Sequence, residues 1–502
     1  MEPSIYTPGA GHRPPVLAGR DALIQAWRLM LNDVAVRGRV GARDVVLAGP
    51  RGIGKTSALL AFGDICGQSR YEVVNLQPAA GNAGLVDSLL SEARERIDGG
   101  SGAWERAKRA FERIGAFNVN VAGFGAGMTT RDRRDATPAV SAGSLARALA
   151  ELAQEVRREH PAAGVLVTVD EMQVAAPADL ALLAAALQRL NADHPQATVL
   201  FAGSGLPQMP EVLRAAGVTH PDRLFDIRQV PLTLSPDDAR YAIIEPARTH
   251  KVQWDPAAAD LVVHATNGYP AHLQLFADHA WRFADPSSRT ITLRDAQHAV
   301  SSAAAELEER TLGPRLERLT DRQAELLAAI AVHGGGATIS DLTTTLQRAS
   351  STTYSRIRDE LITEGDIFAP RRGELALTVP LFGPYLLANY EDVRGRASVR
   401  VMSLEDMQRD AEALANIRLA RGAQAPLATR AAERPTTPRG CRRRPRNRHG
   451  ALVRNHPPLG HDALPEHRAS VPRHPCQWHP AVTYIRAGER TTTVAERPSS
   501  AR

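Results

Sequence analysis

The sequence contains few cysteines and few lysines, and it lacks long hydrophobic runs. Its three cysteines, Cys66, Cys441 and Cys476, match no metal-binding spacing. This small, odd number argues against a disulfide framework and is typical of a reduced protein. No stretch approaches the ~18 to 20 apolar residues of a membrane helix, and the first residues lack the apolar segment of a signal peptide. We therefore expect a cytoplasmic protein without a membrane segment.

The excess of positive charge is confined to the last part of the chain. The 502 residues carry a net charge of +6, and only Lys55, Lys108 and Lys251 are lysines. Residues 421–502 contain 16 arginines and 5 acidic residues, so residues 1–420 have a net charge of −5. The basic character of the chain is thus weak support for nucleic-acid binding by its folded part. The apolar fraction of 43% is that of an ordinary globular protein and excludes wholesale disorder.

The segment Gly49–Thr56 reads GPRGIGKT and fits the phosphate-binding pattern GxxxxGK[ST]. An apolar run precedes it and a helical pattern follows it, which is the strand–loop–helix context this motif requires. Backbone N–H groups of such a loop surround phosphate oxygens at the positive end of a helix. We expect Lys55 to bind the β and γ phosphates and the Thr56 hydroxyl to bind Mg²⁺. The predicted nucleotide-binding residues are Gly49, Pro50, Arg51, Gly52, Ile53, Gly54, Lys55, Thr56 and Ser57.

A second acidic motif ends the apolar run Gly164–Glu171, which reads GVLVTVDE. Carboxylates at the end of a parallel strand face the crevice where ligands bind in α/β proteins. We expect Asp170 to hold Mg²⁺ together with Thr56. We expect Glu171 to act as the general base that activates a water molecule.

Two further side chains are candidates for the site. Ser204 follows the run TVLFAG and is either a sensor of the γ-phosphate or a turn residue between two glycines. Arg223 precedes the next apolar run and either stabilises transition-state charge, in cis or from a neighbouring subunit, or is a solvated loop residue.

The order of the predicted elements indicates an α/β fold, with a P-loop NTPase core built on a parallel sheet. Strand-like runs alternate with helical patterns and are followed by a helical region and a helix–helix–helix–hairpin pattern. The predicted strands are 44–49, Tyr71–Leu76, Val165–Val169, Thr198–Ala202 and Phe225–Val230. The predicted parts are a core over 15–233 with an insertion at about 100–142 that holds one or two short strands, a helical lid over 234–310, a winged-helix domain over 318–390, a helical extension over 391–420 and a disordered tail over 421–502.

The winged-helix pattern raises the question of DNA binding. Its third predicted helix, Ser350–Thr363, carries Arg356 and Arg358, and its wing carries Arg371 and Arg372. These arginines are candidate contacts to phosphates and bases. Acidic residues on the same helix weaken that expectation, and winged helices also serve as packing modules. The arginine-rich tail is either a non-specific nucleic-acid binder or an out-of-frame extension.

The motifs together resemble those of AAA+-related ATPases, in particular origin-recognition-like and AAA-16-type bacterial domains close to the STAND signal-transduction ATPases. The resemblance rests on GPRGIGKT, VLVTVDE, FAGSG and NGYP, and on the opening VLAGRDALIQAW. It implies ATP and Mg²⁺ as ligands, and it implies that Val16–Arg20 borders the adenine. The arginine usual in AAA+ lids is not evident, and His272 stands near its place. Pro270 resembles the proline of the STAND lid, which would pack on adenine.

These observations predict an ATP-binding and ATP-hydrolysing molecular switch that acts on a partner or DNA through its winged helix. Two alternatives remain open. One is a non-hydrolysing DNA-binding or scaffold regulator, and the other is a DNA-stimulated loader in replication, transposition or phage defence. A nucleotide-dependent homo-oligomer and an unidentified protein partner are compatible with each of them.

Overall fold

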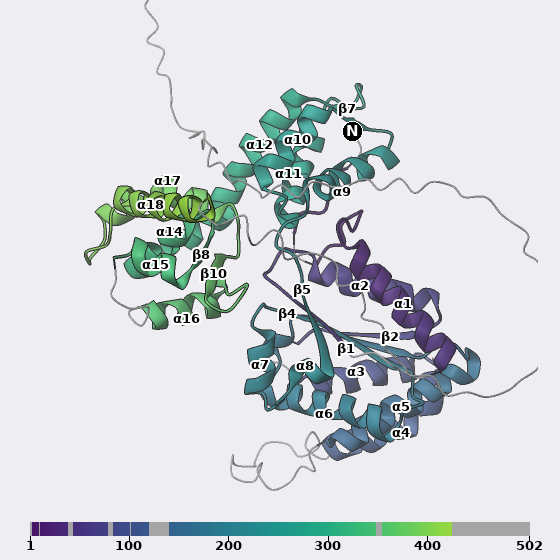
Figure 1. The fold of residues 1–502 in the computed structure, drawn as a ribbon. Helices are drawn as coiled ribbons and strands as arrows, with labels where there is room; N and C mark the ends of the chain where they lie inside the picture. Colours follow the sequence, from purple (N-terminus) through teal and green to yellow (C-terminus); the bar gives the residue numbers. More distant parts are fainter. Residues whose placement is uncertain are drawn as a thin grey trace, which may run out of the picture.

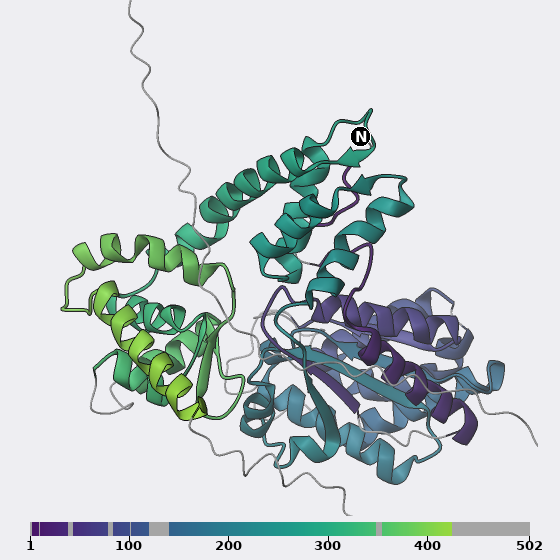
Figure 2. The same cartoon turned by 45° about the horizontal axis from the view of Figure 1, so that its top comes forward.

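The computed structural model describes residues 3–9, 11–38, 44–78, 84–100, 102–119, 140–347 and 354–423. The described residues form a core, a helical lid and a winged-helix domain. In Figure 1 the lid stands above the core, and the winged-helix domain lies beside both, as the turned view in Figure 2 also shows. The predicted tail lies outside the described residues, apart from the last residues of the final helix.

A five-stranded parallel sheet forms the centre of the core, in the order β2-β3-β4-β1-β5. The strands are β1 (Asp44–Ala48), β2 (Glu72–Leu76), β3 (Val165–Val169), β4 (Val199–Gly205) and β5 (Phe225–Gln229). The predicted parallel α/β sheet is thus confirmed. Since β1, β3 and β4 are adjacent and parallel, the residues that follow them meet at one edge of the sheet.

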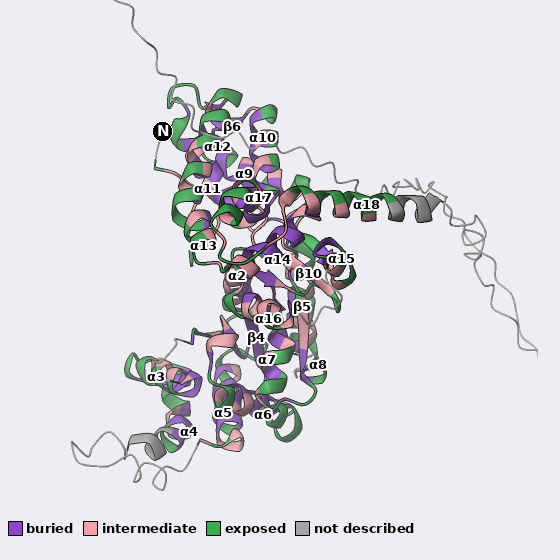
Figure 3. Ribbon diagram, turned by 90° about the vertical axis from the view of Figure 1, so that its left-hand side faces the viewer, coloured by how far each residue is buried: buried purple, intermediate pink, exposed green. Residues whose placement is uncertain are grey.

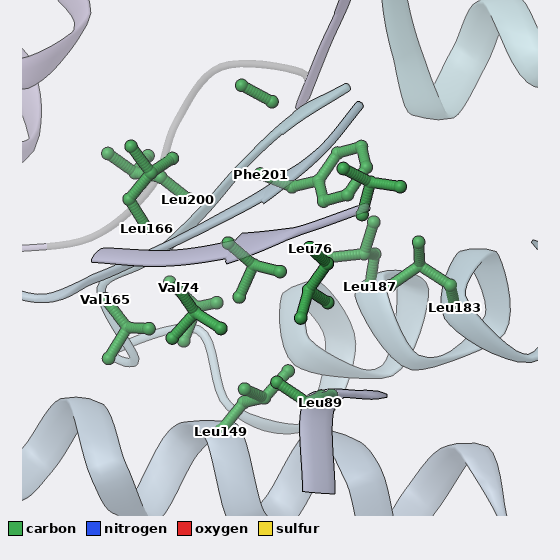
Figure 4. Close-up of a cluster of buried hydrophobic side chains, with 14 of the residues drawn as sticks. Val74, Leu76, Leu89, Leu149, Val165, Leu166, Leu183, Leu187, Leu200 and Phe201 are labelled. Carbon is green, nitrogen blue, oxygen red and sulfur yellow. The ribbon is translucent and has the colours of Figure 1, made fainter. Parts of the chain in front are cut away.

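Helices cover both faces of this sheet (Figure 1). One face is covered by α1 (Asp21–Arg37) and α2 (Lys55–Gln68), and the other by α3 (Leu85–Asp98), α5 (Ala142–Glu159) and α6 (Pro177–Asp193). Short helices α7 (Met209–Ala215) and α8 (Pro221–Leu224) connect β4 to β5. Leucines of α3, α5 and α6 lie against apolar strand residues in the core (Figure 4). Each fully buried leucine contributes roughly 1.5–3 kcal/mol. The core residues labelled in Figure 4 are Val74, Leu76, Leu89, Leu149, Val165, Leu166, Leu183, Leu187, Leu200 and Phe201.

The predicted insertion begins with a helix and not with strands. Residues Gly102–Val119 form α4, which packs against α3 and α5. Trp104 and Phe111 lie on the same face of this helix, about two turns apart. Both are buried, and their ring centroids are 5.3 Å apart. The prediction of an irregular or strand-containing segment is therefore wrong up to residue 119, and its remainder at 120–139 lies outside the described residues.

The lid follows β5 and is helical, as predicted, apart from one short strand pair. Its helices are α9 (Pro236–Thr249), α10 (Pro256–Thr266), α11 (Pro270–Phe283) and α12 (Leu293–Leu307), and β6 (Gln253–Trp254) pairs with β7 (Thr290–Ile291). The sequence marks the helix ends: Ser235 accepts from the N–H of Asp238, and Asn267 ends α10 in the left-handed region. A short π-helix at Glu308–Leu312 then leads into α13 (Gly313–Glu317).

The next residues have the winged-helix order of helix, strand, two helices and two strands. These elements are α14 (Asp321–Val332), β8 (Gly336–Thr338), α15 (Ile339–Thr345), α16 (Ser355–Glu364), β9 (Ile367–Phe368) and β10 (Glu374–Leu377). The three strands form an antiparallel sheet in the order β8-β10-β9. The winged-helix prediction is confirmed, although β8 was not predicted and α16 begins five residues later than expected.

Two helices complete the described chain, α17 (Phe382–Gly395) and α18 (Leu404–Ala423). The predicted helical extension corresponds to α18, whereas α17 was not predicted. Figure 3 shows α18 extending outward from the winged-helix domain with mostly exposed and intermediate residues. Glu325 in α14 is fully buried. Its carboxylate accepts hydrogen bonds from the Tyr354 hydroxyl at 2.8 Å and from the Met402 N–H at 2.9 Å, and so joins α14 to the segments that precede α16 and α18. Within the described ranges, no helix combines the length and apolarity that a membrane span requires.

Candidate functional site

The P-loop follows β1 and ends at the first turn of α2, as the sequence predicts. Gly49 donates its N–H to the Gly205 carbonyl at the end of β4, at 3.1 Å. Gly52 and Gly54 have φ values of +75° and +87°, a region that favours glycine. Because Gly54 caps α2, the loop turns directly into the positive end of a 14-residue helix. Ile53 is buried beneath the loop, whereas Arg51 is exposed.

Lys55 is the first residue of α2, and its side chain is only 4% exposed. Its ammonium group donates to the Pro50 carbonyl at 2.7 Å, across the loop. Burial lowers the pKa of Lys55, and the carboxylates of Glu171 and Asp170 oppose that shift. The only buried lysine of the described chain thus lies inside the P-loop with two acidic groups nearby. Thr56 and Ser57 follow it, both half-buried.

Asp170 is at the centre of a hydrogen-bond network at the end of β3. It accepts from the Thr56 hydroxyl at 2.6 Å and from the Ser204 hydroxyl, which comes from the end of β4. The predicted pair of Mg²⁺ ligands, Thr56 and Asp170, therefore lies together. Ser204 is fully buried within β4, so it is not a turn residue.

Glu171 has an unusual backbone, with a φ of +51°, where the chain turns away from β3. Its N–H donates to the Asp170 carboxylate at 3.0 Å. Its own carboxylate accepts from the Gln173 side chain at 2.6 Å and lies 3.9 Å from the Arg51 guanidinium. The carboxylate is about one-quarter exposed. The predicted base thus lies at the edge of the sheet, beside the P-loop.

The lid contacts the P-loop at the start of α11. The Tyr269 hydroxyl donates to the Arg51 carbonyl, and the Ala271 N–H donates to the Gly52 carbonyl at 3.1 Å. A Cβ added at Gly52 would lie 2.6 Å from the Tyr269 hydroxyl oxygen. Glycine at this position therefore allows the lid to approach the phosphate-binding loop.

Pro270 and His272 lie in the first turn of α11. Pro270 is the first residue of this helix and is half-buried, between the two residues that touch the P-loop. The His272 ring lies with its centroid 4.6 Å from that of Tyr269, and its Nδ1 has no hydrogen-bond partner among the described residues. Burial lowers the pKa of His272 to about 4, so the side chain is neutral at pH 7.

The N-terminal segment crosses from the lid to the core. Tyr6 is buried in the lid, where its hydroxyl donates to the Ile243 carbonyl at 2.5 Å and accepts from the Trp254 indole at 3.0 Å. Seven residues later, Arg13 forms a 2.5 Å ion pair with Asp64 of α2. Arg13 and Asp64 are each about half exposed, so this ion pair contributes little. Tyr6 therefore provides the main attachment of the N-terminal segment, which is to the lid.

Arg20 brings the same N-terminal segment to the P-loop. Its guanidinium, 4% exposed, donates to the Ile53 carbonyl at 2.8 Å. Burial lowers the pKa of Arg20, and the charge of Asp238 in α9 opposes that shift. A Cβ at Gly19 would lie 2.9 Å from Leu234 at the start of the lid. The segment Val16–Arg20 thus lies between the P-loop and the lid.

A buried ion pair joins the end of the lid to the winged-helix domain. Asp366, fully buried, accepts two 2.7 Å hydrogen bonds from Arg318 and lies 3.2 Å from the Arg315 guanidinium. Burial lowers the pKa of Arg315, and the charge of Asp366 opposes that shift. The sequence interpretation did not identify this group, because a pairing across 48 residues leaves no periodic signal.

Arg223 lies away from the site assembled at the P-loop. It is an exposed residue of α8, immediately before β5 begins beside the first residue of β1. The P-loop is at the other end of β1, roughly 15 Å along a five-residue strand. Arg223 therefore does not reach the P-loop of its own chain, and a role in cis is wrong.

The predicted DNA-contacting arginines lie on the winged-helix domain, and three of them pair with acids of the same chain. Arg356 pairs with Glu360 at 2.9 Å and Arg358 with Asp359 at 2.8 Å. On the wing, the Arg371 guanidinium lies 3.7 Å from Glu374, whereas Arg372 is exposed. With Glu364 included, α16 has a net charge of −1. Residues 350–353, where the predicted helix begins, lie outside the described residues.

Comparison with known protein families gives two matches along the chain. Residues 16–200 match the family described as AAA ATPase domain, and residues 309–386 match a family described as Domain of unknown function (DUF8462). No curated protein matches the chain.

Three solved structures resemble parts of the fold. The Walker-type ATPase of Pyrococcus abyssi is 16% identical, covers 74% of this chain and 97% of its own, and has a TM-score of 0.47. The ORC2 protein of Aeropyrum pernix is 14% identical over 83% and 100%, with a TM-score of 0.44. RuvB of Thermotoga maritima is 16% identical over 76% and 96%, with a TM-score of 0.37. On the sequence match, the chain carries an AAA ATPase domain over residues 16–200.

Proposed function

We propose that the chain is an ATP-hydrolysing molecular switch whose nucleotide state is read out by its lid and winged-helix domain. The observation that carries the proposal is the meeting of Lys55, Thr56, Asp170 and Glu171 at one edge of the sheet. These groups come from two loops that are separated by 114 residues. Burying a lysine costs free energy. Ionisable groups with perturbed pKa values gather at functional sites, so the buried Lys55 beside two carboxylates favours a ligand-binding role.

The residues at this edge fit a nucleoside triphosphate with Mg²⁺. The Thr56 hydroxyl and the Asp170 carboxylate, 2.6 Å apart, are the hard oxygen donors that Mg²⁺ prefers. A Cβ built at Gly54 would meet no atom within 4 Å, so the front of the loop is open to a ligand. The loop N–H groups and the start of α2 favour bound anions. The AAA ATPase match favours ATP over GTP.

Each residue has a defined task in the proposed reaction. Lys55 exchanges the Pro50 carbonyl for phosphate oxygens, while Thr56 and Asp170 hold Mg²⁺. Bound Mg²⁺ supplies positive charge that offsets the charge of the phosphates. Glu171 accepts the proton of the attacking water on its carboxylate, and Ser204 keeps Asp170 in place.

The lid and its neighbours are proposed to report the reaction. Tyr269 and Ala271 attach α11 to the P-loop backbone, so a change in the loop moves the lid. Pro270 is proposed to pack on the adenine. The ion pair of Arg315 and Asp366 transmits lid position to the winged-helix domain. Arg223 is proposed to act only in trans, on the site of a neighbouring subunit in a homo-oligomer.

Nucleotide-dependent melting of the full chain tests the proposal. At ~100 times Kd, ATP with Mg²⁺ should stabilise the wild type by ~2.7 kcal/mol, and Lys55→Ala should lose most of this shift. Lys108→Ala is the matched control, because this half-buried lysine lies on α4 and pairs only with Glu105 among described residues. Equal ATP-induced shifts in the wild type and Lys55→Ala would refute ATP binding at the P-loop. An ATP turnover that Glu171→Gln leaves unchanged would refute the assigned base.

A further inference from the structure

Gln173 is a half-buried polar residue at the site to which the proposed reaction gives no task. Its side-chain N–H donates to the Glu171 carboxylate at 2.6 Å, and its side-chain oxygen accepts from the Leu206 N–H at 3.1 Å. An amide side chain donates from its nitrogen and accepts at its oxygen, so it makes both contacts without carrying charge. Gln173 therefore links the proposed base to the residue that follows β4.

The backbone that carries Gln173 is fixed by tight packing. Gln173 lies in a single 3₁₀ turn, Met172–Val174, directly after Glu171. Met172 is fully buried against β4, where a Cβ added at Gly203 would lie 2.2 Å from the Met172 sulfur. The Val174 N–H donates to the Glu171 carbonyl at 2.9 Å. A side chain on such a turn has a well-defined starting point, as a positioning group requires.

The end of β4 leaves space for this amide. A Cβ added at Gly205 would lie 3.1 Å from the Gln173 side-chain oxygen and 2.3 Å from the Met209 sulfur. The glycines on both sides of Ser204 thus allow Met172, Gln173 and Met209 to approach the strand. The pattern Gly203-Ser204-Gly205 is explained by this packing and not by a turn.

Among the described residues, the Glu171 carboxylate forms one ion pair within 4 Å, and that pair is poor. The Arg51 guanidinium lies 3.9 Å away on a side chain that is 75% exposed. An exposed ion pair of this kind adds little and does not fix a rotamer. Without Gln173, the Glu171 side chain would sample several rotamers, and a general base acts only when it lies within reach of its proton.

We propose that Gln173 is a positioning residue that holds the Glu171 carboxylate toward the end of β4. Two residues at that strand end, Ser204 and Leu206, then control both acidic groups. Ser204 holds Asp170 directly, and the Leu206 N–H holds Glu171 through Gln173. A shift of residues 204–206 therefore changes the metal ligand and the base together. This inference rests on the proposed ATPase function.

Two substitutions test the two hydrogen bonds of the Gln173 amide. Gln173→Met keeps length but removes both hydrogen bonds. Gln173→Glu keeps the acceptor for Leu206 but removes the donor and places a second carboxylate next to Glu171. We expect both variants to lower kcat for ATP by about tenfold or more. KM should stay within about threefold of the wild type, and the ATP-induced melting shift should stay within about 1–2 °C of the wild-type shift.

A double-mutant cycle distinguishes positioning of Glu171 from a general structural role. If Gln173 acts through Glu171, adding Gln173→Met to Glu171→Gln lowers kcat no further. Losses that multiply in the double mutant, or an unchanged kcat in both single variants, would overturn the inference. A wild type whose turnover does not depend on Glu171 would overturn the proposed function and this inference together. A wild type that depends on Glu171 but not on Gln173 would overturn the inference alone.

Discussion

The hydroxyl of Thr56 donates to the Asp170 carboxylate at 2.6 Å although the two residues belong to different loops. Thr56 lies in the first turn of α2, and Asp170 follows the last residue of β3. The parallel sheet brings them together, because β4 is the neighbour of both β1 and β3. This relationship gives the candidate site its two oxygen donors for Mg²⁺.

Asp170→Asn should weaken ATP binding only when Mg²⁺ is present. The substitution keeps the shape and removes the charge that attracts the cation. We expect the Kd for ATP to rise about tenfold or more with Mg²⁺ and to stay within twofold of the wild type in EDTA. Asp193→Asn, an exposed substitution at the end of α6, serves as the control. Isothermal titration with and without EDTA measures the difference, and a Mg²⁺-independent loss would contradict the assignment.

Gly52→Ala should destabilise the contact between P-loop and lid even without nucleotide. The new Cβ combines a positive φ with an approach of 2.6 Å to the Tyr269 hydroxyl oxygen. Together these should cost about 1–3 kcal/mol. Gly217→Ala is a matched control, because its φ is +94° but no atom lies within 4 Å of the added Cβ. Denaturant unfolding of both variants separates the clash from the backbone strain, and equal losses would argue against a close lid.

His272 should make the protein sensitive to acid. Burial lowers its pKa in the fold to about 4 from the ordinary 6.5. Between these pH values the unfolded chain binds a proton that the folded chain does not, so the free energy of unfolding falls as pH falls. The full contribution over this window is about 3 kcal/mol.

His272→Gln should remove that part of the pH dependence, whatever its effect at pH 8. The exposed His264 of α10 provides the control substitution His264→Gln. Urea unfolding at several pH values between 4 and 7 gives the slopes. A wild-type slope in His272→Gln would show that the buried ring is not responsible.

DNA binding by the winged-helix domain should be weak, because its arginines already have acidic partners. Three of the four candidates lie within 3.7 Å of a carboxylate of the same chain. We predict that a chain without residues 421–502 keeps its nucleotide binding and retains weak DNA affinity. Exchanging Arg371 and Arg372 for Glu should abolish that affinity. Salt-dependent binding of the full, shortened and wing-reversed chains measures it, and no binding after shortening would leave the winged helix as a protein-contact module.

The sequence predicted the parts of the fold that have local signals. The P-loop, the strand that ends in Asp170 and Glu171, and the caps at Ser235 and Asn267 all follow from short patterns with a direct physical cause. The parallel sheet followed from alternation of strands and helices. The apolar positions Trp104, Ala107 and Phe111 also carried a helical signal, which the glycines farther along obscured.

The remainder depended on contacts between distant residues. Gln173 shows no motif, and its task appears only when Leu206 is placed beside it. Arg315 and Asp366 are ordinary surface residue types that become buried only through the packing of two domains. Arg223 lies far from the P-loop because β5, which it precedes, runs parallel to β1. The sequence around Arg223 does not reveal this pairing.

The attachment of Tyr6 in the lid has a consequence for synthesis of the chain. Its acceptor at Ile243 lies 237 residues later, so at ~5–20 residues per second the ribosome completes this partner roughly 10–50 s after Tyr6. During that interval the Tyr6 ring cannot be buried, because the lid residues that surround it have not yet been synthesised. Assembly of the lid therefore requires the segment around Tyr6 to remain accessible until α11 emerges with Trp281, whose ring then lies 6.1 Å from that of Tyr6.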